Sequence, residues 1–410
     1  MEEDPIQIDV RRAIHSLSDA LDLVGIDERY HGKRVAFMAV ECGKTMGWDD
    51  TLLNTIYSAS LLHDCGVSST QVHRSLVTEL DWSGSQVHCE RGEALLSKCR
   101  LFEGLPPIIR YHHTHWDDLP ADLDPTVAMM SNLIYMTDRV DASIAHHQGV
   151  DILISRHAIC KTIQNYRGNF FAGELVDAFL AIAAREFFWL NLEPGHLAAF
   201  ISDMESSQPE QFSDHRALLE VAAIFADIVD AKSPFTAEHS RGVAQLARHL
   251  GVLLGLPEHT RFGLEAAGLL HDLGKLNVPD EILEKPGPLS EEERAVIMRH
   301  SFESYQILRK ILGFQDIALW AACHHECPSG AGYPFHRNRR GLSLEALIIA
   351  VADVFQALVQ NRPYRDSMPL DRALGIMSDM AKAGRLEPDL VLLCQSNSES
   401  CLAHARVITP

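Results

Sequence analysis

The sequence lacks several features that would assign it to a common class of protein. Its nine cysteines include no pair at the two-residue spacing of redox or zinc motifs, so we expect reduced thiols. The longest apolar stretch, 346–359, is interrupted by Asp353 and is too short to span a membrane. The opening residues MEEDPIQID are acidic and have no apolar core, so no secretory signal is expected. These absences predict a soluble, cytoplasmic protein.

Positive charge is also scarce, with a formal net charge of −20. Long-range repulsion therefore argues against a general partner among polymeric nucleic acids or acidic membranes. A small phosphorylated substrate remains open if metal ions and a few local cations reverse the field inside a pocket. Cys323 and Cys327 flank a histidine pair, but two thiols so placed make a poor tetrahedral zinc set.

The chain is predicted to be all-α. Apolar residues recur at helical spacing over 35–46, 175–188, 218–229 and 243–254, and no alternating β-branched run is long enough for a sheet. The polar segment 205–214 is the best linker, which divides the chain into domains 1–205 and 206–410. The 410 residues are enough for two ordinary domains.

An internal repeat of histidines and aspartates is the most informative feature present. The interval from His31 to His63 equals that from His239 to His271, and the interval from His88 to His112 equals that from His300 to His324. The first copy comprises His31, His63, Asp64, His88, His112, His113 and Asp138. The second comprises His239, His271, Asp272, His300, His324, His325 and Asp353. A repeated series of these residue types indicates two helical modules built to hold metal ions.

The second copy can be divided into two ligand sets. An adjacent imidazole and carboxylate, His271 and Asp272, can bind one cation while the second carboxylate oxygen reaches another. His239 and Asp353 would complete the first set. The second set is His300, His324 and His325. Mixed nitrogen and oxygen donors favour two Fe or Mn ions over structural zinc, and ions roughly 3.5–4 Å apart suit in-line phosphoryl displacement.

Two small insertions in the second copy are expected to be loops beside the site. One is 285–289, followed by a helix for which Ser290 and Glu293 predict a capping box. The other is the glycine-rich segment 329–334, directly after the histidine pair.

Four segments of the second half resemble an HD-GYP domain of the HD superfamily. They are HDLGKLNVPDEILEKPGPLSEEE, MRHSFESYQIL, HHECPSGAGYP and AVADVFQALVQNRPYR, in that order. The resemblance covers about residues 215–385. It implies an all-α bundle and a metal-dependent phosphodiesterase of bacterial second-messenger signalling. The implied substrate is a cyclic dinucleotide.

The resemblance also assigns roles by position. It implies that the seven second-copy residues are metal ligands and that Asp272 and Lys275 are catalytic. Its implied substrate contacts are Lys275, Gly332, Tyr333, Pro334, Arg362 and Arg365. For the two arginines an ordinary helix-end cation pair stays open. Some family members have a glutamate four residues before the first histidine that binds a third metal. Phe235 stands there, so two metals are predicted.

The first half resembles a degenerate HD domain. Val67 replaces the lysine, and neither a GYP loop nor an RPYR segment follows. Losing these groups should cripple phosphate handling while leaving a vestigial metal site at the first-copy residues. We expect a regulatory or scaffolding domain, and retention of the ligand types by descent alone stays open.

Several functions remain to be separated. The leading hypothesis is hydrolysis of cyclic di-GMP to linear pGpG and onward to GMP, by hydroxide activated between two metals. The alternatives are a hydrolase preferring 3′,3′-cyclic GMP-AMP, a non-hydrolytic nucleotide-binding module, and a hydrolase of nucleotide tri- or tetraphosphates, which the GYP loop and RPYR segment disfavour. A homodimer or a signalling protein partner is compatible with each.

Overall fold

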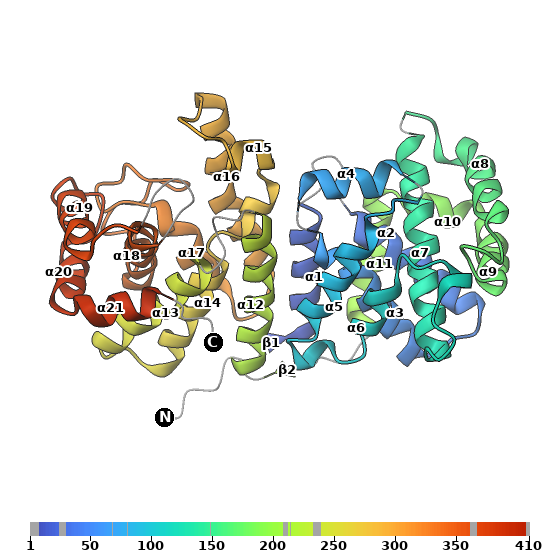
Figure 1. The fold of residues 1–410 in the computed structure, drawn as a ribbon, viewed down its shortest axis with the longest axis horizontal. Helices are drawn as coiled ribbons and strands as arrows, with labels where there is room; N and C mark the ends of the chain where they lie inside the picture. The colour runs from blue at the N-terminus through green and yellow to red at the C-terminus, as the bar shows by residue number, and fades with distance from the viewer. Residues whose placement is uncertain are drawn as a thin grey trace. The chain divides into compact units, whose positions relative to one another are not determined.

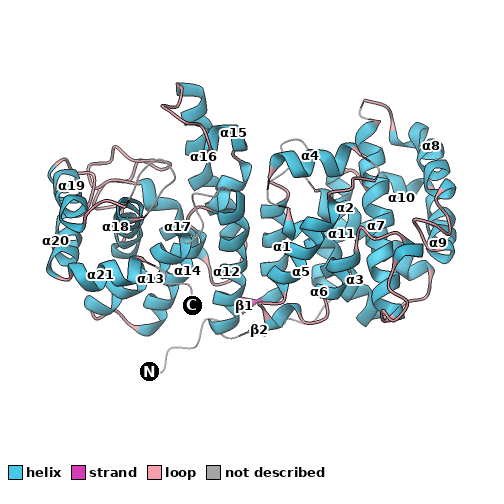
Figure 2. Cartoon of the chain, in the orientation of Figure 1, coloured by secondary structure: helices cyan, strands magenta, loops and turns pink. Residues whose placement is uncertain are grey.

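The computed structural model describes residues 8–23, 30–67, 69–79, 81–147, 149–207, 212–213, 215–232, 239–360 and 367–406. Helices dominate this part of the chain, and the predicted all-α class is confirmed (Figure 2). The named strands are only β1 (Ile8–Asp9) and β2 (Phe212–Ser213), which pair antiparallel with Ile8 opposite Ser213.

The described residues divide into two compact units. One unit lies within Leu17–Glu210, and the other combines Met1–Ser16 with Gln211–Pro410. The first eleven α-helices, coloured blue to green in Figure 1, are α1 (Val10–Leu21), α2 (His31–Thr45), α3 (Asp50–Leu62), α4 (Thr70–Thr78), α5 (Ser85–Leu96), α6 (Pro106–Tyr111), α7 (Pro125–His146), α8 (Ile152–Asn165), α9 (Gly173–Ala183), α10 (Glu186–Leu190) and α11 (Pro194–Ser207). Short 3₁₀ helices are η1 (His63–Gly66), η2 (Arg100–Phe102) and η3 (Trp116–Asp118).

The remaining helices belong to the second unit, which also includes α1 as far as Ser16. They are α12 (His215–Lys232), α13 (His239–Leu253), α14 (Glu258–Leu270), α15 (Asp280–Leu283), α16 (Glu291–Leu308), α17 (Gln315–Ala322), α18 (Leu344–Val359), α19 (Leu370–Lys382), α20 (Pro388–Ser396) and α21 (Ser398–Ala405). Two 3₁₀ helices, η4 (Leu273–Asn277) and η5 (Cys323–His325), interrupt them.

Local sequence explains where several helices begin and end. Ser290 caps α16 by accepting from the Glu293 amide at 3.2 Å, and Glu293 Oε2 accepts in return from the Ser290 amide at 2.7 Å. This capping box confirms the prediction made from the two residues. The single helix expected over 175–188 is wrong, because α9 ends at Ala183 and α10 starts at Glu186. The apolar periodicity continues across the break because both helices bury aromatic residues.

The second unit packs around helix α13. α13 contacts α14 and α18, and these helices lie side by side in Figure 1. η4 packs against α16, where Gly274 permits a very close approach: a Cβ atom there would lie 2.1 Å from the His300 carbonyl oxygen. The glycine therefore allows the segment after Asp272 to rest on the helix that carries His300.

The first unit repeats this contact. η1 packs against α5, and a Cβ atom at Gly66 would lie 1.9 Å from the His88 carbonyl oxygen. The two copies of the repeat therefore share a packing arrangement as well as a residue pattern. Among the described helices of either unit, none combines the length and apolar content that crossing a membrane requires.

Candidate metal centre

Seven side chains predicted as ligands in the second half converge from six elements. His239 begins α13, His271 ends α14 as its C-cap, Asp272 leads into η4, His300 lies in α16, His324 and His325 lie in η5, and Asp353 lies in α18. Groups among them whose ligand atoms lie within 4.8 Å of one another are His239–His271–Asp353, His271–Asp272–His324 and His300–His324–His325. The fold thus joins residues that the sequence holds far apart.

Asp272 lies between two sets of imidazoles. Its Oδ2 atom is 3.3 Å from His271 Nε2 and 3.7 Å from His239 Nε2. Its Oδ1 atom is 3.5 Å from His300 Nε2 and 3.8 Å from His324 Nε2. Each carboxylate oxygen therefore faces a different ligand set, as a bridging aspartate requires.

The imidazoles are oriented by their outer nitrogens. The Nδ1 atoms of His271, His300 and His324 donate to the carbonyl oxygens of Gly268, Ile297 and Ala321, at 2.8, 2.6 and 2.6 Å. Such bonds fix the tautomer and turn the bare Nε2 atom toward the centre.

A divalent cation fits this donor set. Within the described part of the chain, the buried His271 Nε2 and Asp272 Oδ1 have no hydrogen-bond partner. His300 Nε2 and His324 Nε2 lie 3.2 Å apart. A metal ion would satisfy these inward-facing atoms, which could hold divalent cations.

The titration of Asp272, His300 and His325 also suits metal binding, whereas the pKa of His271, which burial lowers, is raised by Asp272 to about 8. Burial by itself raises the pKa of Asp272, but His271 and Lys275 hold that pKa well below its usual range. Burial lowers the pKa of His300 to about 3 and that of His325 to about 4. The carboxylate is thus ionised and these two imidazoles are neutral at pH 7, which are the states that bind metal.

The predicted substrate contacts differ in how the structure places them. Lys275 Nζ donates to Asp272 Oδ2 at 2.5 Å, so this cation lies at the centre. The Tyr333 ring lies 4.8 Å from the His325 ring, which brings the Gly332-Tyr333-Pro334 loop to the same place. Arg362, Arg365 and Phe235 lie outside the described residues.

Two supporting residues were not predicted from the sequence. Gln356 Oε1 accepts from His239 Nδ1 at 2.5 Å. The buried Glu326 carboxylate accepts from the amides of Phe335 at 2.6 Å and Arg337 at 3.1 Å, and so holds the loop after Tyr333. The sequence could have indicated Gln356 as a supporting residue, because it lies three positions after Asp353 and therefore on the same helix face. Glu326 directly follows the histidine pair.

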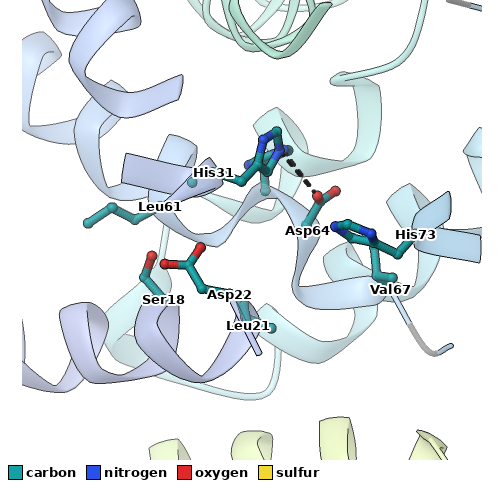
Figure 3. A pocket seen from close by; sticks show the side chains of 10 residues that line it. Ser18, Leu21, Asp22, His31, Leu61, Asp64, Val67 and His73 are labelled. Carbon is teal, nitrogen blue, oxygen red and sulfur yellow. Dashed lines mark hydrogen bonds and ion pairs between the residues drawn. The ribbon is translucent and has the colours of Figure 1, made fainter. Parts of the chain in front are cut away.

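The first-half residues are brought together as well. Among them Asp64, His88, His112 and His113 form one group, and His31, His63 and Asp64 another. A pocket borders the second group, and Figure 3 shows the ion pair between His31 and Asp64 in its lining. Val67 lines this pocket where the other half has Lys275.

Comparison with known proteins gives a consistent picture. Residues 223–390 match the model of the HD domain family. The chain is 36% identical over 398 residues to 3′3′-cGAMP-specific phosphodiesterase 1 of Vibrio cholerae, covering 96% of this chain and 92% of that protein. It is 37% identical over 169 residues to the cyclic di-GMP phosphodiesterase response regulator RpfG of Xanthomonas campestris, covering 41% and 44%.

A solved structure is similar over almost the whole chain. The crystal structure of the cyclic GMP-AMP specific phosphodiesterase V-cGAP3 of V. cholerae has a TM-score of 0.66 and 25% identity, covering 98% of this chain and 99% of that one. The likeness spans both halves, whereas the family model matches the second half alone.

Proposed function

The chain belongs to the HD-domain cyclic dinucleotide phosphodiesterases, and from this premise we propose that its second half hydrolyses its substrate at the cluster around Asp272. The observation that carries the proposal is the placement of the two Asp272 oxygens, one toward His239 and His271 and the other toward His300 and His324. The seven candidate ligands of the second copy would hold two divalent ions, Fe or Mn.

Bound metal ions would supply Lewis-acid stabilisation of the phosphodiester and a water nucleophile at neutral pH. The protein's own contribution is to orient the ligands and the substrate. The outer hydrogen bonds of the imidazoles fix the direction of their Nε2 atoms. Lys275, a quarter exposed and close to Asp272, is placed to neutralise a phosphate oxygen.

The GYP loop completes this site. Glu326 holds the backbone that follows Pro334, and the Tyr333 amide donates to the His325 carbonyl oxygen at 3.2 Å. These contacts tie the position of the loop to the histidine pair. The loop would therefore border the bound nucleotide at a fixed distance from the ligands.

The full-length likeness favours 3′,3′-cyclic GMP-AMP as the preferred substrate. The relative that covers 96% of this chain is named as specific for that nucleotide, whereas RpfG, a cyclic di-GMP enzyme, matches only 41%. The cyclic di-GMP preference expected from the second half alone is not established, and we retain this nucleotide as the second candidate. Hydrolysis would give a linear dinucleotide in either case.

The direct test combines metal analysis with turnover. The protein purified anaerobically would be assayed for Fe, Mn and Zn per chain, and both cyclic dinucleotides would be followed by chromatography. We expect His271→Ala and Asp272→Ala each to reduce hydrolysis by about 10³-fold or more, because each removes a ligand at the reacting centre. Both variants should also bind less metal.

A matched control lies on the same helix as His271. His259 is exposed in the first turn of α14, so His259→Ala should retain wild-type turnover and metal content. Wild-type activity in either site variant would show that the centre is misassigned. Faster turnover of cyclic di-GMP than of 3′,3′-cyclic GMP-AMP would overturn the substrate preference while leaving the site intact.

A further inference from the structure

We propose that the first half of the chain is a second metal centre, in which one divalent transition-metal ion lies between His31 and His63 and is closed by Asp64 and Asp138. The match to the HD family model does not include this half, since it covers residues 223–390. The proposal rests on first-half geometry and does not depend on where the substrate is hydrolysed.

The donor atoms of the first half keep the spacing of the second half. Five equivalent distances differ by no more than 0.1 Å between the halves. His31 lies 3.4 Å from Asp138 and 3.6 Å from Asp64, and its counterpart His239 lies 3.3 Å from Asp353 and 3.7 Å from Asp272. Asp64 lies 3.4 Å from His63 and 3.5 Å from His88, and its counterpart Asp272 lies 3.3 Å from His271 and 3.5 Å from His300. The distance between His88 and His112 is 3.1 Å, and that between His300 and His324 is 3.2 Å.

The hydrogen bonds at the Nδ1 atoms of His31 and His63 show which ring nitrogen of each faces the centre of the cluster. His31 Nδ1 donates to Asp141 Oδ2 at 2.7 Å, and His63 Nδ1 donates to the Ser60 carbonyl oxygen at 2.8 Å. Because a carboxylate and a carbonyl only accept, both rings carry hydrogen on Nδ1, and Nε2 is the ring atom left to face an ion.

The Nε2 atoms of these two rings face each other. His31 Nε2 and His63 Nε2 lie 3.2 Å apart, and both rings are buried. Two ring nitrogens at this distance need a proton or a metal cation between them. Asp64 and Asp138 add carboxylate oxygens to the same space, so two nitrogen and two oxygen donors surround it. That set suits a divalent transition metal.

The surroundings of His31 differ from those of its counterpart in a way that strengthens metal binding. Asp141 takes the place that Gln356 has beside His239, and Arg34 pairs with Asp141 Oδ2 at 2.8 Å. A carboxylate behind a ligating imidazole raises its basicity as a ligand. The bordering pocket in Figure 3 gives an ion access to His31 and His63.

The same region lacks what phosphate chemistry needs. Val67 is apolar, and the buried Arg139 donates to Asp138 Oδ2 at 2.7 Å, so it already neutralises one oxygen of that ligand. We infer a single ion that stabilises this half and does not turn over substrate.

The test is metal content per folded chain. The full-length protein would be loaded with Mn²⁺, desalted and analysed for bound metal, with circular dichroism as a check on folding. We expect His31→Gln/His63→Gln to lose about one ion per chain relative to wild type, because both nitrogen ligands are removed. Second-half hydrolysis should remain measurable. The matched pair His239→Gln/His271→Gln should lose its metal from the other half. Equal metal content in wild type and the first-half variant would overturn the proposal and indicate a shared proton.

A milder variant keeps the test decisive if the double variant fails to fold. Asp141→Asn preserves both imidazoles and gives this half the amide that the other half has. Chelator competition should show roughly 10–100-fold weaker binding of the first-half ion, as expected for loss of a carboxylate behind a ligand. Asp124→Asn, which keeps the N-cap of the same helix α7, should leave the affinity unchanged. An unchanged affinity in Asp141→Asn would also overturn the proposal.

Discussion

Lys232 is a buried cation beside the segment that carries Lys275. Its ammonium group donates to the Leu276 carbonyl oxygen in η4, and Asp280 Oδ1 lies 3.9 Å away. Burial lowers the pKa of Lys232 to about 8, although Asp280 and Glu281 act in the opposite direction. The side chain therefore carries a desolvation cost at neutral pH while it holds η4 in place.

This pKa predicts how stability depends on pH. Between about pH 8 and 10.5 the unfolded chain binds more protons at Lys232 than the folded chain, so the contribution of this group to stability rises with pH. Relative to Lys232→Met, wild type should gain stability across this window, on the order of 3 kcal/mol at most. Urea unfolding at several pH values would measure the difference. The exposed Lys382→Met variant should show no such trend, and a flat difference for Lys232→Met would contradict the prediction.

At the scale of elements, the loop after η5 is held by a close backbone approach. A Cβ atom at Gly332 would lie 2.4 Å from Glu326 Cα and 2.5 Å from the His325 carbonyl oxygen. Neither contact can be relieved by rotating a side chain, because one involves backbone oxygen and the other a Cα atom. The loop can therefore rest on the histidine pair only if this residue is glycine.

Gly332→Ala should push the loop away from the centre. Turnover is expected to fall by about 10²-fold, since small misplacements of positioning groups have effects of this size. Gly375→Ala is the matched control, because Gly375 is exposed in α19 and has no atom within 4 Å of the added Cβ. That variant should keep activity and gain up to about 1 kcal/mol of stability from helix propensity. Equal turnover in the two variants would show that the loop does not position the substrate.

At the scale of the whole molecule, two clusters of buried imidazoles and carboxylates could hold metal ions. The donor atoms come from helices distant in sequence, so the folded chain presents each set and the unfolded chain does not. Metal binding at these clusters would therefore be coupled to folding.

Removing metal should lower the unfolding temperature of the chain. Ions at about 100-fold above their dissociation constant stabilise a site by roughly 2.7 kcal/mol, so chelation should shift the transition by several degrees. Calorimetry before and after treatment with a chelator, and again after adding Mn²⁺, would measure the loss and its recovery. The double variant His31→Gln/His63→Gln should show a smaller loss than wild type. An unfolding temperature insensitive to chelation would contradict this coupling.

The amino-acid sequence determined the candidate ligand types, their order and their duplication, because equal intervals between histidines survive as positions on matching helices. It also determined the all-α class and the start of α16, since helical periodicity and a capping box act locally. The prediction of a single helix over 175–188 was wrong, because the apolar periodicity continues through the turn between two helices that both bury apolar residues.

Only the tertiary structure decided how these residues act together. The division of the Asp272 oxygens, the carboxylate behind His31 and the amide behind His239 depend on helices that meet across long intervals. His239 and Gln356, for example, are 117 positions apart in the sequence. Such contacts follow from the packing of whole elements, in which glycines such as Gly274 permit close approach. Sequence spacing fixes which side chains share a helix face, whereas the direction of each donor atom is fixed by the neighbours that folding brings to it.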